Sequence, residues 1–131
     1  MKNLLSATLV CLIISASSLI AQSNITWTIK DKLEKGEIKS MTVFNSNLSG
    51  FSNKQEAINF CQKLKTNPEV ASCDIITNNG ANCDVKLSMK QPHNKQYYIG
   101  FAQKSNIANI EVNGQKKTTA QMLQEMRDKK K

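Results

Sequence analysis

The chain has 131 residues and carries 18 Lys and Arg against 10 Asp and Glu, a net charge of +8 at neutral pH. This length is enough for one domain with one modest core, and we expect a single domain. The basic residues are spread along the sequence, as on a solubilising surface; the alternative is an anionic partner such as a lipid headgroup, a polysaccharide or a nucleic acid.

Residues 1–21 have the pattern of a secretory signal peptide. Lys2 gives a positive start, a continuous run of apolar and small residues follows, and Ala21 stands at a suitable cleavage site. The run is too short and wrongly flanked for a lasting membrane span. We therefore expect an exported protein, periplasmic or extracellular, and the composition rich in Lys, Asn and Ile favours a bacterial source.

Residues 22–37 form an N-terminal extension whose conformation the pattern leaves open. Ile25, Trp27 and Ile29 alternate with polar residues as in a strand. The charged stretch after them also suits a short helical turn closed by Gly36.

From residue 38 the pattern indicates a strand and then a helix. Residues 38–48 alternate and contain Val, Phe and Thr, as strands do. A capping box from Ser52 to Gln55 starts the helix. The helix is expected to end before Pro68, because the residue preceding a proline is disfavoured in the helical region. Its inward face combines Ala57, Phe60, Cys61 and Leu64.

Residues 70–90 predict a β-hairpin, with Asn79 and Gly80 as its turn. The alternating positions are Cys73, Ile75 and Thr77 on the first strand and Cys83, Val85, Leu87 and Met89 on the second. Antiparallel pairing is expected to place Cys83 opposite residues 75–77.

The last third of the chain predicts a helix, a strand and a second helix. Residues 92–105 favour a helix closed by a left-handed Asn106, although Gly100 and the run of aromatic and β-branched residues before it leave a strand as the alternative. Residues 107–112 predict a strand. Thr118 and Gln121 form a second capping box, and the helix it opens turns Met122, Leu123 and Met126 inward and runs into a basic tail.

The order strand, helix, strand, strand, helix, strand predicts an α+β protein with a ferredoxin-like βαββαβ sandwich, an antiparallel sheet with helices on one face. This domain would span residues 38–114. Residues 115–131 would add a C-terminal helix and the tail. A fold of this kind specifies no function by itself.

The corner between the first strand and helix reads Gly50-Phe51 followed by Asn53 and Glu56, and a valine, Val70, follows the helix end. On these positions residues 39–112 resemble the heavy-metal-associated domain of copper chaperones and metal-transporting ATPases. That family carries two cysteines where Asn53 and Glu56 stand. The resemblance therefore implies the fold but speaks against Cu(I) binding at the usual site, since soft ions need thiolate ligands.

Three cysteines remain outside the first 21 residues: Cys61, Cys73 and Cys83. In the expected topology the first helix packs over the hairpin, so Cys61 and Cys73 face inward at a similar level and are expected to form a disulfide, leaving Cys83 free. A Cys73–Cys83 bridge is the second choice. The three thiols could instead bind Cu(I) or zinc.

No catalytic constellation is recognisable. His93 is the one histidine and is expected to be a solvated loop residue, while Asp74 and Asp84 point outward as surface charges. The sequence thus predicts neither an enzyme nor a cofactor.

These features together predict a small, exported, non-enzymatic binding module of the bacterial envelope. Its working surface would be the open sheet face, an edge strand or the basic tail. We expect a protein or peptide as its partner rather than a nucleic acid. Two alternatives stay open: a Cu(I) or zinc protein that uses the three cysteines, and a thiol redox protein that uses Cys83.

Overall fold

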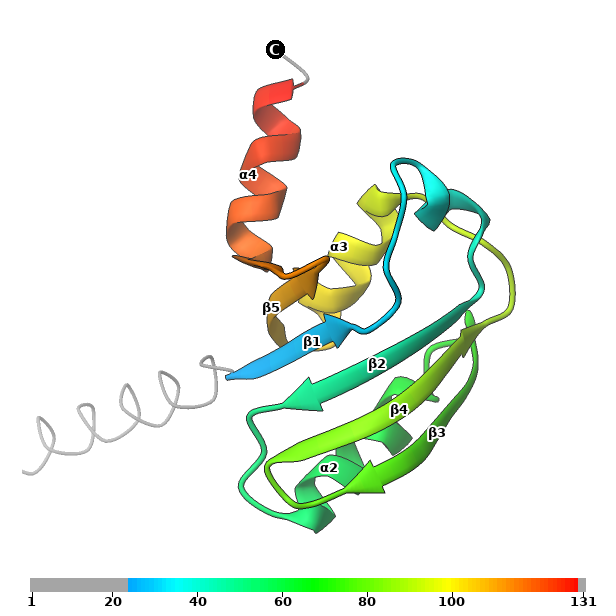
Figure 1. The fold of residues 1–131 in the computed structure, drawn as a ribbon, viewed down its shortest axis with the longest axis vertical. Coiled ribbons are helices and arrows are strands. Elements are labelled where there is room, and N and C mark those ends of the chain that lie inside the picture. Colours follow the sequence, from blue (N-terminus) through cyan, green and yellow to red (C-terminus); the bar gives the residue numbers. More distant parts are fainter. Residues whose placement is uncertain (1–23, 130–131) are drawn as a thin grey trace, which may run out of the picture.

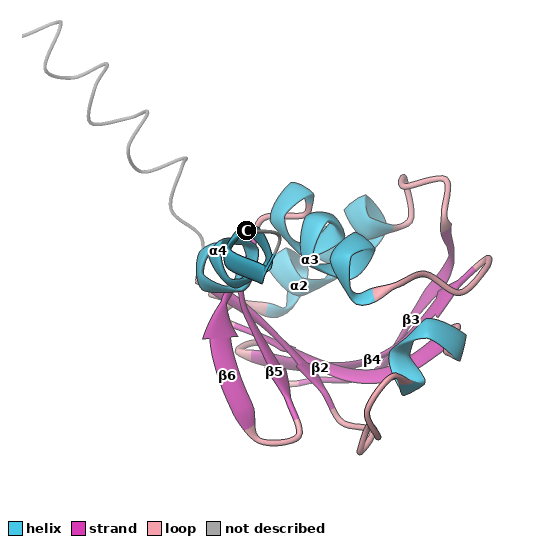
Figure 2. Cartoon of the chain, turned by 90° about the horizontal axis from the view of Figure 1, so that it is seen from above, coloured by secondary structure: helices cyan, strands magenta, loops and turns pink. Residues whose placement is uncertain are grey.

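The computed structural model describes residues 24–129, which form a six-stranded sheet with helices packed on one face (Figures 1 and 2). The predicted signal peptide and the last two lysines of the tail lie outside these residues. The strands are β1 (Ile25–Ile29), β2 (Val43–Ser49), β3 (Val70–Asn78), β4 (Asn82–Met89), β5 (Ile107–Val112) and β6 (Gln115–Thr118). The helices are α2 (Lys54–Leu64), α3 (Lys95–Lys104) and α4 (Thr119–Lys129), with a short 3-10 helix, η1 (Glu37–Ser40). Within residues 24–129 no helix has the length and apolar character needed to cross a membrane.

The strand order is β3-β4-β2-β1-β5-β6. The protein is therefore α+β as predicted, but the order differs from that of a plain βαββαβ sheet. The strand β1 lies between β2 and β5, antiparallel to the first and parallel to the second. The expectation of a fully antiparallel sheet is wrong for this reason. The N-terminal segment, whose conformation the sequence left open, supplies one of the two central strands.

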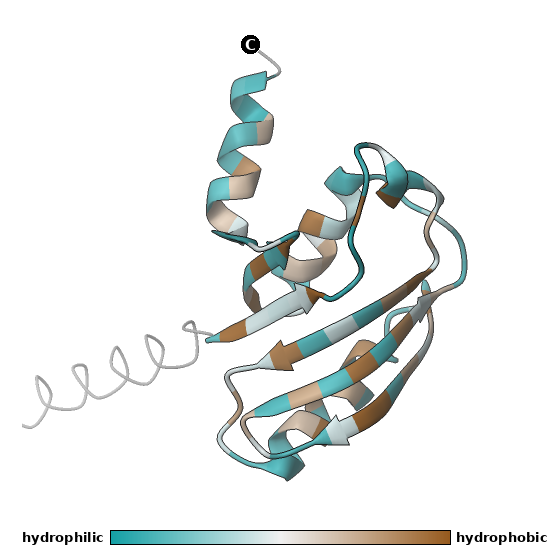
Figure 3. Cartoon of the chain, viewed as in Figure 1, coloured by the Kyte–Doolittle hydropathy of each residue, from teal (hydrophilic) through white to brown (hydrophobic). Residues whose placement is uncertain are grey.

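Trp27 explains why β1 occupies the middle of the sheet. Its side chain is 1% exposed and meets the rings of Phe44, Tyr98 and Phe101 edge-on, with centroid separations of 6.0 to 6.4 Å. Its indole N–H donates a 2.8 Å hydrogen bond to the hydroxyl of Ser46 on the neighbouring strand. A buried indole with a satisfied N–H anchors the strand that carries it. Figure 3 shows the alternation of hydrophobic and hydrophilic residues along the strands.

The corner before α2 is fixed by glycine and asparagine. Gly50 has a φ of 103°, and a Cβ there would lie 2.2 Å from the carbonyl oxygen of Asn24, so only glycine fits. The helix begins one residue later than predicted, because Asn53 rather than Ser52 is the cap. The Asn53 side chain accepts a 2.8 Å hydrogen bond from the backbone N–H of Glu56.

The predicted hairpin is confirmed as β3 and β4, and residues 95–104 are helical rather than extended. Asn94 caps α3 by accepting a hydrogen bond from Tyr97 N–H, and Asn106 ends the helix at a φ of 65°, as predicted. The prediction missed β6. Asn113 and Gly114, with φ of 52° and 79°, turn the chain directly from β5 back into β6.

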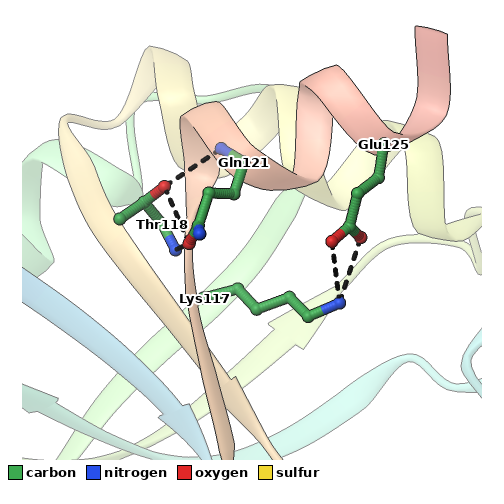
Figure 4. A network of polar contacts seen from close by, with 4 residues as sticks. All are labelled: Lys117, Thr118, Gln121 and Glu125. Atoms are coloured by element: carbon green, nitrogen blue, oxygen red, sulfur yellow. Dashed lines mark hydrogen bonds and ion pairs between the residues drawn. The ribbon is translucent and has the colours of Figure 1, made fainter. Parts of the chain in front are cut away.

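The second capping box is confirmed at the start of α4 (Figure 4). Thr118 Oγ1 accepts from Gln121 N–H at 3.0 Å, and the Gln121 side chain accepts from Thr118 N–H at 3.0 Å. The helix then projects away from the body of the sheet (Figure 1). Of the three residues predicted to face inward, Met122 packs against the core, and Leu123 and Met126 are likewise half-buried.

Candidate functional site

The corner that resembles a metal site is used for folding. The side-chain oxygen of Asn53 is engaged in capping α2, and Glu56 supplies the N–H that it caps. Phe51 is buried against Phe60, with 5.5 Å between ring centroids. In the part of the chain that the structure describes, no group of three or more His, Cys, Asp or Glu is arranged to hold a metal ion.

The three cysteines lie where α2 packs on the sheet, and all are buried and in the free thiol form. Cys61 is on the helix and is close enough to hydrogen-bond with both Cys73 on β3 and Cys83 on β4. The hydrogen bond from Cys61 lowers the pKa of Cys73, while that bond and burial raise the pKa of Cys61. Burial raises the pKa of Cys83 to about 11. A buried thiol with a raised pKa is the opposite of a reactive redox cysteine.

The strand register excludes the Cys73–Cys83 bridge that the sequence left as a second choice. Cys73 pairs with Leu87, whereas Cys83 pairs with Asn78. Leu87, the partner of Cys73, lies four residues along β4 from Cys83, which is about 13 Å in an extended strand. A disulfide requires Cα atoms within about 7 Å. The Cys61–Cys73 bridge stays a prediction, and its two thiols are neighbours in the structure.

His93 is not the solvated loop residue that the sequence predicted. Its ring stacks on Tyr97 at 3.7 Å between centroids, and its Nε2 lies 3.5 Å from a carboxylate oxygen of Glu69. The loop before α3 is folded back against the helix, which the polar sequence around the histidine does not indicate.

The two aspartates of the hairpin do not pair with each other across the strands. Asp74 pairs across the strands with Lys86, and Asp84 with Thr77. Hydrogen bonds from Asn47 and Thr77, with the nearby Lys30, lower the pKa of Asp84. The open face of the sheet thus holds Asp84 as a stable carboxylate within a local polar network.

The two sheet edges are β3 and β6. The β3 edge exposes Ile75 and Ile76, the latter by 65%. Its pairing with β4 shifts register between Val70 and Ser72 and again between Ile75 and Thr77. Such irregularities interrupt the row of backbone groups and hinder strand addition. The edge strand therefore supports partner capture less well than the sequence suggested.

A cavity of about 450 Å³ lies at the opposite end of the sheet, between β1, β5, β6, α3, α4 and the segment that follows β1. Its floor consists of buried apolar side chains, Trp27, Ile29 and Ile110 from the sheet and Ile99 from α3. Three partly buried residues, Leu33, Ile38 and Met122, form its upper walls. Two hydrogen bonds between the Asn113 side chain and the backbone of Leu33, of 2.9 and 2.8 Å, hold the wall segment to the β5–β6 turn.

The rim of the cavity is polar and mainly basic. Lys35, Lys95 and Lys117 line it, together with the carboxylate of Glu34. Lys117 is bound to Glu125 of α4, with its Nζ 3.0 Å from each carboxylate oxygen (Figure 4). The rim thus has more positive than negative charge over an apolar interior.

Tyr98 lines the cavity and is almost fully buried. The residue is 2% exposed, and its hydroxyl has no hydrogen-bond partner. The backbone of His93 comes close enough to oppose the effect of burial, but burial prevails and raises the pKa of the phenol.

Comparison of the chain with protein families, curated proteins and solved structures found no significant match. By its fold and its cavity, the protein is described as a small α+β protein with a lysine-rimmed apolar cavity.

Sequence reasoning missed this cavity because its lining comes from six segments. The one local signal was the Asn113-Gly114 pair, which indicates a hairpin and hence the position of Lys117 on a further strand.

Proposed function

We propose that the protein is an exported, non-enzymatic binding module of the bacterial envelope and that its ligand site is the cavity beneath α4. The occupant would be a small molecule with an apolar body. The observation that carries this proposal is the cavity itself, about 450 Å³ in volume with a floor of buried apolar side chains. Ligand sites in proteins are mostly apolar clefts of this size with a few polar groups.

A non-enzymatic role is supported by where the reactive side chains lie. The three cysteines are buried between α2 and the sheet, and Asp84 is on the open face of the sheet. Neither His93 nor any of these residues lines the cavity. The cysteines, His93 and Asp84 are therefore separate from the proposed ligand site.

We also propose that the fold derives from a ferredoxin-like unit. Leaving out β1 and β6 reduces the strand order to β3-β4-β2-β5, which is how a βαββαβ unit arranges its strands. The heavy-metal-associated resemblance would then concern the scaffold, and export would follow from the signal peptide predicted at residues 1–21.

The cavity is tested with N-phenyl-1-naphthylamine, a neutral apolar fluorophore that brightens in a dry site. We expect saturable binding of one probe per chain. The variant Met122→Trp places a large side chain in the cavity wall and should weaken binding at least about tenfold, because the space is filled. Fluorescence titration gives the stoichiometry and the dissociation constant of the probe, and circular dichroism verifies that the variant is folded.

The matched control is Met126→Trp, which makes the same change one turn further along α4, outside the cavity lining. It should bind the probe as the unaltered protein does. Equal weakening by both variants, or no weakening by Met122→Trp, would show that the probe binds elsewhere.

A further inference from the structure

We infer that the cavity selects an anionic amphiphile, a molecule with a carboxylate head held at the lysine rim and a single apolar chain lying beneath α4. This inference rests on the proposed function, and it names the class of ligand.

The charge of the rim supports an anion. Three lysines, Lys35, Lys95 and Lys117, line the cavity against one carboxylate, Glu34. The side chains of Lys35 and Lys95 are exposed at the mouth, so a head group can reach them without entering the core. An anion is favoured in such a site, and the net charge of +8 adds a long-range attraction.

Glu125 shows that the rim accommodates a carboxylate. Both of its oxygens lie 3.0 Å from Lys117 Nζ. The hydrogen bond from Lys117 lowers the pKa of Glu125, with further contributions from the charges of Lys117 and Lys95. Glu125 itself does not line the cavity. A carboxylate of the chain's own α4 thus already binds one lysine of the rim, and a ligand head would have to compete with it for Lys117.

The interior supports an apolar chain. The floor residues Trp27 and Ile99 are each 1% exposed, so the floor is a closely packed apolar base. Leu33, Ile38 and Met122 close it from above and are only partly buried. Because they line the cavity and keep part of their apolar surface exposed, they offer contacts to a thin apolar chain. A ligand with a charged head at the lysine rim and an apolar chain in the cavity matches this arrangement of a basic rim and an apolar lining.

The test is calorimetric titration of the purified protein with decanoate, decanol, decylamine and decyl phosphate below their micelle concentrations. We expect decanoate to bind with a stoichiometry of one and at least about threefold more tightly than decanol, which lacks the charge. Decylamine should bind more weakly than decanol. The preference for decanoate should fall with added salt, because rim charges are screened.

Two substitutions should change decanoate affinity in opposite directions. Glu125→Gln frees Lys117 and should raise the affinity about threefold, whereas Lys95→Gln should lower it by a similar factor. Neither should alter the binding of decanol. The controls are Asp128→Asn on α4 and Lys104→Gln at the far end of α3, which change the same charges away from the cavity lining.

Equal affinities for decanoate and decanol, with no effect of Glu125→Gln, would overturn the anionic head while the neutral-probe result still supports a ligand site. Tighter binding of decyl phosphate than of decanoate would overturn the carboxylate in favour of a phosphate head. Absence of binding by every decyl compound would overturn the inference. Absence of naphthylamine binding as well would overturn the proposed function.

Discussion

Cys61 occupies a position in α2 from which its thiol reaches two neighbouring strands. It is close enough to interact with both Cys73 and Cys83, although Cys73 pairs with Leu87 and so lies four residues along β4 from Cys83. Any single disulfide in the described chain must therefore include Cys61. The sequence names Cys73 as the partner, and the interaction with Cys61 lowers the pKa of the Cys73 thiol.

We predict that oxidised protein contains one Cys61–Cys73 disulfide and that Cys61→Ala contains none. The bridge closes a loop of about a dozen residues, so its loss should lower the free energy of unfolding by about 3 kcal/mol. Alkylation in denaturant without reductant, followed by intact mass measurement, counts the free thiols. Urea unfolding gives the stability.

Cys83→Ala is the matched control for this prediction. It removes a thiol that is buried to the same extent but leaves the bridge intact, so no free thiol should be alkylated. A disulfide in the Cys61→Ala protein would contradict the register of β3 and β4.

Individual residues show where sequence reasoning fails at this scale. The sequence predicted the inward direction of Cys61, Cys73 and Cys83 correctly, because alternation and helical periodicity encode it. It misplaced His93, since stacking on Tyr97 depends on how the loop folds back on α3. No local pattern contains that information.

Helix α4 projects from the sheet with one apolar side against the core, so its first turn depends on the capping box (Figure 1). Thr118 and Gln121 satisfy two backbone groups at its start. Most of its remaining polar residues face solvent. The wall that Met122 gives to the cavity is therefore only as stable as this first turn.

We predict that Thr118→Ala destabilises α4 by about 1 kcal/mol, the usual cost of losing a cap. Hydrogen exchange should show lower protection in α4 while protection in β2 and β4 stays unchanged. Naphthylamine binding should weaken as well, because the wall that carries Met122 frays.

Gln124→Ala provides the control on the same helix. The Gln124 side chain donates a hydrogen bond to the exposed Asp128. Its removal should therefore change the free energy of opening of α4, measured by hydrogen exchange, by less than about 0.5 kcal/mol. If hydrogen exchange in α4 were as slow in the Thr118→Ala protein as in the unaltered protein, the role assigned to the cap would be contradicted.

Elements were predictable where a cap or a turn marks them. The helices, the hairpin and the strand at 107–112 followed from periodicity and from Asn-Gly and capping signals. The four residues of β6 carry two lysines and no apolar alternation, so they do not read as a strand. They pair because the turn at Asn113 and Gly114 returns them along β5.

At the scale of the whole molecule, the strand order was beyond the sequence. The parallel pairing of β1 with β5 joins residues about eighty positions apart. Alternation identifies such strands but not their neighbours. The cavity follows from that pairing, since it places β1, the segment after it and the β5–β6 turn around one space.

The central claim is that this cavity is the ligand site of the molecule. The most direct measurement is a methyl NMR spectrum of Ile- and Met-labelled protein titrated with N-phenyl-1-naphthylamine, whose aromatic rings shift the resonances of nearby methyl groups. We predict large shifts at Ile99, Ile110 and Met122 and none at Ile75 or Ile76 on the β3 edge. Shifts at the β3 edge with none at Met122 would contradict the claim.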